Sequence, residues 1–238
     1  MVTQLKLGDI TVDVILKDIK NVHLKVYPPK GQVRISAPVN MPLDTIRVFA
    51  ISKLDWIKRH QQQLIEQERE TFREYLDRES HYVWGKRYLL TVSESQQPPT
   101  VHLEPERMVL QVRPGTDAIT RQGIVAAWYR DQIKEAAPAL FAKWEPVMGV
   151  TVKRLFVRQM KTKWGSCNPQ SASIRFNTEL AKKPRECFEY VLVHELAHLL
   201  EPSHNARFIA IMDRFLPRWR FDRDRLNQLP VRHQEWAY

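Results

Sequence analysis

The pattern of hydrophobic and polar residues changes from strand-like to helix-like twice along the chain. Residues 10–37 contain three short strand-like runs, ITVDVIL, NVHLKVYP and QVRISAP, separated by turn-forming residues, and these predict a small meander sheet. After Pro42, apolar residues recur at helical spacing into the charged stretch QERETFREYLDRE, which predicts one long helix. Between Tyr82 and Val112, strand-like runs return and predict a second small sheet.

The C-terminal half opens with a helical pattern from Ala118 to Trp144, in which Pro138 predicts a kink or a break. A strand-like KRLFVRQ, a loop MKTKWGSCNPQSA and a short strand SIRFN follow. Two helices are expected next. The first has Pro184 in its first turn and ends before Pro202, and the second opens after Ser203 as its N-cap. No internal repeat is visible in the sequence.

The composition excludes several classes of protein. With 238 residues, 43% hydrophobic and 27% charged, the chain is globular rather than disordered. The N-terminus lacks a secretory signal, and no apolar run is long enough to span a bilayer. Two cysteines, Cys167 and Cys187, are too few for a disulfide framework or a four-cysteine zinc site. We therefore expect a cytoplasmic protein with no membrane partner.

The excess of basic residues is concentrated in one region of the chain. The formal net charge is +10, and residues 151–225 hold 15 Lys or Arg against 8 Asp or Glu. Such a region attracts anions, whether a nucleic acid, a nucleotide or an acidic peptide. A solvated basic surface without any partner explains the same count equally well.

The most specific pattern is His194-Glu195-Leu196-Ala197-His198, an H-E-x-x-H motif in the first of the two expected C-terminal helices. Helical geometry places the two histidines, at i and i+4, on one face, so that both imidazoles can bind one metal ion. Glu195 lies beside that face, where a carboxylate can deprotonate a water molecule on the metal without being a ligand. The motif therefore predicts a catalytic metal site, with Glu195 as the catalytic residue.

A catalytic zinc site needs a third protein ligand and an open fourth position. His204 is the expected third ligand, because Pro202 reverses the chain and returns His204 towards the motif. Glu201 is the alternative ligand, since a carboxylate after the motif can serve the same role. Glu201 also occupies the glycine position of the H-E-x-x-H-x-x-G-x-x-H spacing, so the turn here must differ from that pattern.

The loop and strand before the motif carry a second set of candidates. Gly165 permits a tight turn, and the cations, amides and hydroxyl around it can bind a phosphate or a developing oxyanion. Cys167 is expected to be buried rather than reactive. The strand around Ile174 can pair with an extended substrate. The candidates for substrate or oxyanion binding are Arg158, Lys161, Lys163, Ser166, Arg175 and Asn177.

Taken together, the stretches W-G-S-C, I-R-F-N, Y-V-L-V-H-E-L-A-H and H-N-A-R-F make the chain resemble the YgjP-like family of zincin-type metallohydrolases, which is related to the SprT-like metalloproteases. The resemblance is specific over about residues 150–220. It implies an α+β fold, with a β-rich N-terminal part containing a long helix (1–115) and a zincin-like metallohydrolase core (116–238). It also implies zinc bound by His194, His198 and His204, with Glu195 as catalytic acid and base.

Three functions are compatible with these features. The first is a zinc-dependent peptidase. The second is a nucleoside triphosphate pyrophosphohydrolase, converting for example UTP to UMP and diphosphate, for which Mg²⁺ or Mn²⁺ would be the working ion. The third is a nucleic-acid-associated SprT-like protease, whose phosphate-binding residues would be Arg214, Arg218, Arg220, Arg223 and Arg225.

Overall fold

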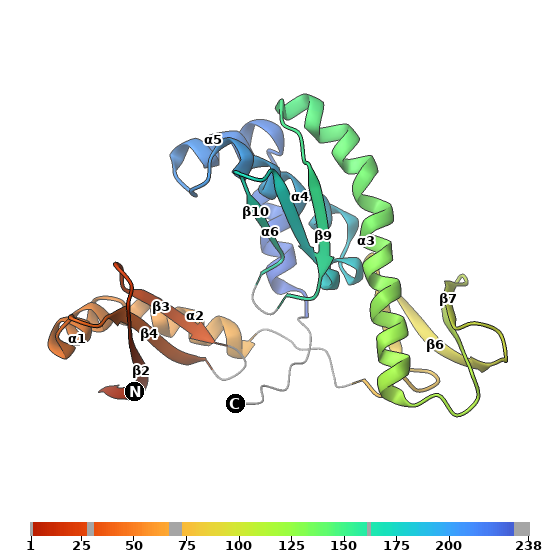
Figure 1. Cartoon of the computed structure of the whole chain (residues 1–238), viewed down its shortest axis with the longest axis horizontal. Helices are drawn as coiled ribbons and strands as arrows, with labels where there is room; N and C mark the ends of the chain where they lie inside the picture. Colours follow the sequence, from red (N-terminus) through yellow and green to blue (C-terminus); the bar gives the residue numbers. More distant parts are fainter. Residues whose placement is uncertain (1, 28–30, 67–72, 161–162, 231–238) are drawn as a thin grey trace. The chain divides into compact units, whose positions relative to one another are not determined.

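A computed structural model describes residues 2–27, 31–66, 73–160 and 163–230 and confirms the predicted α+β class (Figure 1). The chain divides into two compact units, residues 1–70 with 230–238 and residues 71–229. The expected boundary after residue 115 falls inside the second unit, just before a long helix. None of the helices in the described ranges combines the length and the hydropathy that crossing a bilayer requires.

The first unit contains a four-stranded sheet and two helices. The sheet has the order β1-β2-β4-β3, in which β2 and β4 are parallel and the outer pairs are antiparallel. The expected meander is wrong because β4, with its buried Val33 and Ile35, takes the central position beside Val12 and Val14 of β2, whereas β3 is only half buried. The strands are β1 (Val2–Leu7), β2 (Ile10–Lys17), β3 (His23–Tyr27) and β4 (Gln32–Pro38).

The single long helix expected after Pro42 is two helices, α1 (Leu43–Ser52) and α2 (Leu54–Glu66). Lys53 leaves the helical conformation between them, and its N–H donates to the carbonyl of Ala50. This turn allows apolar residues of both helices to reach the core. Residues 67–72 of the predicted helix lie outside the described residues, and the prediction fails again in residues 73–79. In residues 73–79 the carboxylate of Glu79 accepts hydrogen bonds from backbone N–H groups and stabilises turns.

The predicted second sheet is confirmed, and it repeats the strand arrangement of the first. Its order is β5-β6-β8-β7, again with a parallel central pair and antiparallel outer pairs. The same tripeptide, Val-His-Leu, occurs at the third strand of each sheet, at residues 22–24 and 101–103. Otherwise the sequences have little in common, so the repeat is visible only in the structure. The strands are β5 (Ser80–Val83), β6 (Lys86–Glu94), β7 (Thr100–Leu103) and β8 (Arg107–Val112).

Helix α3 (Ala118–Met148) connects this sheet to the rest of the second unit. It runs through Pro138 without a break, because the buried residues on either side of the proline stay on one continuous face. The hydroxyl of Tyr129 donates to the carbonyl of Tyr82 in β5 at 2.8 Å. The indole of Trp144 donates to the carboxylate of Glu189 in the next helix, also at 2.8 Å. Helix α3 is therefore bonded both to β5 and to α4.

The remainder of the second unit is a three-stranded sheet followed by helices (Figure 1). The sheet order is β10-β11-β9, with β9 and β11 parallel. Residues 165–168, expected in a loop, form the edge strand β10, which pairs antiparallel with β11. The elements are β9 (Arg154–Arg158), β10 (Gly165–Asn168), β11 (Ser173–Asn177), the 3₁₀ helix η1 (Thr178–Lys182), α4 (Arg185–Leu200), α5 (Ala206–Phe215) and α6 (Trp219–Gln228).

Helix α4 ends before Pro202, as predicted, and Pro184 is its N-cap rather than a residue of its first turn. The elements after it differ from the prediction in two respects. The N-cap of α5 is Asn205, whose side chain accepts a hydrogen bond from the N–H of Phe208 at 3.0 Å. Ser203, the expected cap, instead donates to the carboxylate of Glu201. Helix α6 was not expected. Its few apolar residues are outnumbered by charged ones, so it lacks a clear helical stripe in the sequence.

We expect the turn between β5 and β6 to be critical for stability. Trp84 and Gly85 both have positive φ, and a Cβ on Gly85 would lie 2.9 Å from Pro184, the residue that precedes α4. Gly85→Ala should therefore cost about 2 kcal/mol or more of unfolding free energy, from backbone strain and the clash together. Gly115→Ala, at positive φ but in open space, should cost about 1 kcal/mol. Chemical denaturation compares the two, and equal losses would contradict the packing contribution.

Candidate metal centre

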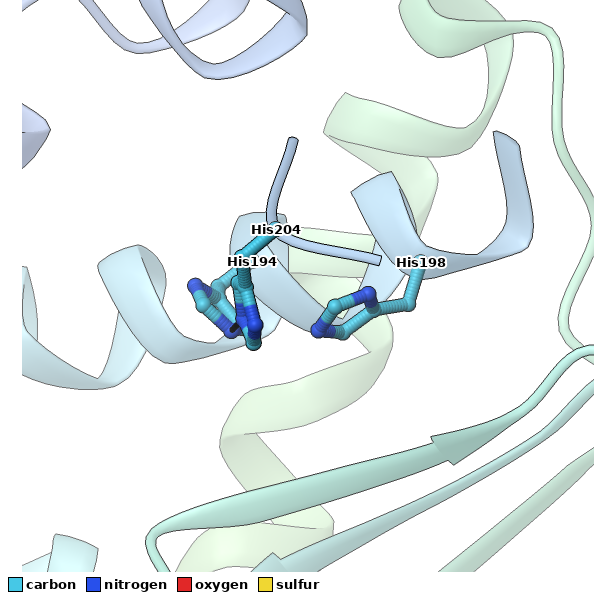
Figure 2. A group of neighbouring side chains, drawn as sticks. All are labelled: His194, His198 and His204. Atoms are coloured by element: carbon cyan, nitrogen blue, oxygen red, sulfur yellow. Dashed lines mark hydrogen bonds between the residues drawn. The ribbon is translucent and has the colours of Figure 1, made fainter. Parts of the chain in front are cut away.

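Three imidazoles converge at the end of α4 (Figure 2). His194 and His198 come from successive turns of α4, and His204 comes from the turn before α5. One possible ligand atom from each ring lies within 4.8 Å of the other two, and the Nε2 atoms of His194 and His204 are 3.0 Å apart. A tetrahedral zinc ion with Zn–N bonds of about 2.05 Å separates its ligand atoms by roughly 3.3 Å. The cluster therefore has the dimensions of a three-histidine metal site.

A backbone carbonyl and an aromatic side chain contact the rings. The Nδ1 of His198 lies 3.1 Å from the carbonyl oxygen of Glu201, which favours the tautomer with an unprotonated Nε2. Below the rings, the buried Phe208 of α5 lies 4.7–4.9 Å from all three imidazole centroids. Backbone and core packing thus hold the side chains in place. The sequence identified Phe208 only as a core residue of its helix.

The local electrostatics favour metal ligation by neutral imidazoles. Burial lowers the pKa of His194 to about 3, and the neighbouring His198 and His204 add to the effect. Burial also lowers the pKa of His198, more than its contact with the carbonyl of Glu201 raises it. Neutral imidazole is the form that binds a metal, and a set of three nitrogen ligands suits zinc better than Mg²⁺.

Glu195 lies beside the triad and is 5% exposed. Burial raises the pKa of its carboxyl to about 8, and the positive charge of Lys163 opposes that rise. The Oε2 atom is buried and has no hydrogen-bond partner among the described residues. A Cβ added to Gly165 would lie 2.5 Å from the other carboxylate oxygen of Glu195, Oε1. Glycine at position 165 is therefore required for the carboxylate to fit beneath β10.

The triad and Glu195 open into a cavity of about 460 Å³. One wall is α4, and the opposite wall is strand β10 together with the residues just before it. Of the candidates for substrate binding, Lys163 and Ser166 line this cavity, whereas Arg158 and Arg175 do not. Lys161 lies outside the described residues.

The strand around Ile174 is not free to pair with a substrate, because β11 has neighbours on both sides. The edge strands of this sheet are β9 and β10, and of these two β10 lines the cavity.

Asn177, another of the candidates, does not line the cavity but anchors the loop beside it. Its side-chain amide donates to the carbonyl oxygens of Met160 and Lys163, both at 2.9 Å. Its Oδ1 accepts from the backbone N–H of Met160 and of Glu179. With 5% of its surface exposed, Asn177 fixes the backbone on both sides of residues 161–162 and so positions Lys163.

Glu201, the alternative ligand, is not part of the cluster of possible ligand atoms found among the described residues. Its carboxylate accepts hydrogen bonds from the N–H and hydroxyl of Ser203, and these bonds lower its pKa. Glu201 instead stabilises the turn that carries His204, and it contacts His198 through its backbone carbonyl.

Two further residues that line the cavity, Cys167 and Tyr190, have raised pKa values. Cys167 is half-buried, and burial with the nearby Glu195 raises its pKa to about 11, so it is a neutral thiol rather than a nucleophile at neutral pH. Tyr190 was missed in the sequence. It lies one turn before His194, and burial raises its pKa to about 12, so its hydroxyl stays protonated. The i−4 spacing to His194 was the available signal.

Comparisons with known proteins assign the chain to one family. The model of the YgjP-like metallopeptidase domain family matches residues 20–229. No curated protein matches the chain. Among solved structures, the zymogen of Pyrococcus abyssi abylysin is 20% identical, covering 40% of this chain and 97% of that one, with a TM-score of 0.36. The zymogen of Methanocaldococcus jannaschii jannalysin is 16% identical, covering 38% and 93%, with a TM-score of 0.34. The family of this chain is shown by the family model, which matches most of its length.

We expect the metal-free chain to bind one Zn²⁺ per molecule. His204→Ala should weaken zinc affinity by at least about 100-fold, because it removes one of three nitrogen ligands. His102→Ala, at an exposed histidine of β7, is the matched control and should leave the affinity unchanged. Competition titration with a chromophoric chelator measures both variants. Wild-type affinity in the His204 variant would exclude it as a ligand.

Proposed function

The chain belongs to the family of YgjP-like metallopeptidase domains, and on this premise we propose that it is a zinc-dependent peptidase that cleaves extended polypeptide segments. In this proposal His194, His198 and His204 bind the zinc ion, and Glu195 is the general base. The observation that carries the proposal is the buried Glu195, which has an unpartnered carboxylate oxygen beside three convergent imidazoles.

Bound zinc supplies Lewis acidity, which lowers the pKa of water towards about 7 and polarises a carbonyl group. Glu195 takes the proton of the attacking water and delivers it to the leaving amine. Its unpartnered Oε2 is free to hold that proton. Lys163, at the rim of the cavity, offers a positive charge to the developing oxyanion. Asn177 keeps that lysine in place through the loop backbone.

Strand β10 gives the substrate a place to bind. It is an edge strand of its sheet, and its residues line the cavity that contains the triad. A polypeptide in extended conformation can add to such an edge through main-chain hydrogen bonds, with little dependence on its sequence. This arrangement would place a peptide bond between β10 and α4, beside Glu195.

We expect Glu195→Gln to reduce hydrolysis of an unstructured peptide by at least about 100-fold, because the amide cannot accept the proton of the attacking water. Zinc content should remain one ion per chain, since Glu195 is not a ligand in this proposal. Mass spectrometry of products from a mixed peptide library, with the zinc-loaded chain and its variant side by side, measures the difference.

The same incubation includes nucleoside triphosphates with Zn²⁺, Mg²⁺ or Mn²⁺. Pyrophosphate release that disappears in the Glu195→Gln variant, without any peptide cleavage, would replace the peptidase by the pyrophosphohydrolase alternative. Peptide cleavage that survives the substitution would exclude Glu195 as the base.

Gly165→Ala should reduce peptide hydrolysis about 100-fold, because its Cβ would displace the Glu195 carboxylate. The backbone of Gly165 does not have positive φ, so the substitution adds no left-handed strain, and its cost to folding comes from the clash with Glu195 alone. Gly123→Ala, in open space within α3, is the control and should retain full activity. Kinetics and zinc content of the two variants are compared. An unimpaired Gly165 variant would show that the carboxylate does not need its observed position.

A further inference from the structure

The part of the chain that builds β9, β10 and β11 has basic residues and no acidic ones. Residues 146–178 contain no Asp or Glu, and their cations are Lys153, Arg154, Arg158, Lys161, Lys163 and Arg175. A surface whose only role is to be solvated usually carries charges of both signs. The segment is therefore a candidate for binding an anionic partner.

Helices α3 and α4 pack on one face of this sheet. Phe176 of β11 lies against Phe141 of α3 and Phe188 of α4, with ring centroids 6.3 and 5.1 Å away. Arg175, the residue before Phe176, projects from the opposite face, because successive side chains of a strand alternate. The side chain of Arg175 is therefore on the face that points away from both helices.

Three residues of β9 share the face of Arg175. The strand register pairs Arg175 with Phe156. Along β9, Arg154, Phe156 and Arg158 are exposed, whereas the residues between them are half-buried. The Phe156 ring is 44% exposed, and the Arg175 guanidinium lies 5.8 Å from its centroid. We call this set the basic sheet face, and its members are Arg154, Phe156, Arg158 and Arg175.

No acidic side chain neutralises the arginines of the basic sheet face. In the part of the chain that the structure describes, none of the three forms an ion pair, and the buried Nε of Arg175 has no hydrogen-bond partner. The arginines of α6 and the residue before it differ, because acidic side chains lie beside them. Those pairs are Arg218–Asp222, Arg220–Asp213, Arg223–Asp224 and Arg225–Glu186.

Strand β9 is also an edge of its sheet. The order β10-β11-β9 gives β9 one neighbouring strand. Among the described residues, no backbone hydrogen bond outside the sheet involves residues 154–158. The main-chain donors and acceptors on the outer side of β9 are thus available to an extended peptide. This edge lies across β11 from β10, so a peptide bound here is separate from a substrate bound at β10.

We propose that the outer edge of β9 binds an acidic segment of a partner polypeptide as an added strand, with Asp or Glu at positions i and i+4 and Val or Ile at i+2. Side chains on one face of a strand repeat about every 6.7 Å. When position i+2 lies opposite Phe156, the two acidic residues therefore lie opposite Arg154 and Arg158.

The contacts across the added strand are of kinds that stabilise a sheet. An added strand runs about 4.8 Å from its neighbour, so directly opposite side chains touch. Pairs of opposite charge, and pairs of an aromatic with a β-branched residue, both stabilise neighbouring strands. Arg175, which leans towards the Phe156 ring from the inner side, adds positive charge to the same face. This binding site is additional to the proposed peptidase function and does not rest on it.

The geometry favours a peptide over a nucleic acid as the occupant. Binding of single-stranded nucleic acid relies on several aromatic rings on which successive bases stack. The basic sheet face has one aromatic ring, Phe156, and the guanidinium of Arg175 already lies close to it. The edge of β9 offers main-chain hydrogen bonds, which an extended peptide can match along its whole length and a sugar-phosphate chain cannot.

The test measures binding in the absence of turnover. The full-length, zinc-loaded Glu195→Gln protein is titrated, by fluorescence anisotropy at low salt, into a labelled 12-residue peptide that contains Glu-Thr-Val-Thr-Glu. The same peptide with Gln in place of both Glu is the first comparison. We expect the Glu peptide to bind about tenfold more tightly, with the difference reduced at high salt.

A second comparison peptide tests the added strand itself. It has the same composition, but its two Glu are three residues apart, so that in an extended chain they project from opposite faces. We expect it to bind about fivefold more weakly than the ordered peptide. Equal affinity of the two would show that charge alone attracts the peptide and would overturn strand addition at β9.

Two double variants locate the binding site. Arg154→Gln with Arg158→Gln, both at exposed positions, should reduce the preference for Glu over Gln to about twofold. Arg87→Gln with Arg113→Gln removes two exposed charges from the β5–β8 unit and should leave the preference intact. Circular dichroism and zinc content verify that each variant is folded.

The outcomes keep this inference apart from the peptidase function. Equal affinity for the Glu and Gln peptides, or equal loss in both double variants, would overturn the site at β9. A 12-nucleotide single strand that binds more tightly than the Glu peptide would overturn the choice of occupant. In the chain with Glu195 intact, Arg154→Gln with Arg158→Gln should leave hydrolysis of a short uncharged peptide unchanged. If the wild-type chain cleaves no peptide but the Glu preference depends on these arginines, the peptidase function alone is overturned.

Discussion

Helix α4 has to bring two imidazoles and a carboxylate into one cavity while nearly all of its surface is buried, and this requirement shapes the elements around it. Its side chains from Cys187 to Ala197 lie in the core almost without exception. A helix that is apolar on every side needs neighbours on every side, and α3, α5, α6, η1 and β10 provide them. Close packing of this kind fixes the histidines before any ligand binds. It also explains why β10 carries a glycine where it crosses Glu195.

The convergence of the three histidines was the feature of the molecule most accessible from the sequence. The H-E-x-x-H spacing depends only on helix geometry, and the turn at Pro202 limits where His204 can lie, so local rules were sufficient. The roles of Glu201 and Asn177 were not accessible in this way. Glu201 contacts His198 through its backbone carbonyl, and Asn177 bonds backbone groups 14 and 17 residues before it. A sequence gives no sign of either kind of hydrogen bond.

The fold was predictable in its elements but less so in their arrangement. Strand character was recognised in all four strands of the second sheet and in three of the first, where β1 was missed. The shared order of both sheets places the fourth strand beside the second, a pairing that depends on contacts remote in sequence. Strand β10 was missed because Gly165 and Asn168 have poor strand propensity, which pairing with β11 overrides. The expected long helix failed for a local reason, since the turn at Lys53 allows both Ala50 and Ile57 to be buried.

The hydrogen bonds of Tyr129 and Trp144 give helix α3 a mechanical role. These residues are separated by roughly 22 Å along the axis of one unbroken helix. One bond attaches the helix to the β5–β8 sheet, and the other attaches it to α4. The helix therefore acts as a stiff rod between the two. A load that tilts the sheet would be transmitted along this rod to the helix that carries His194 and His198.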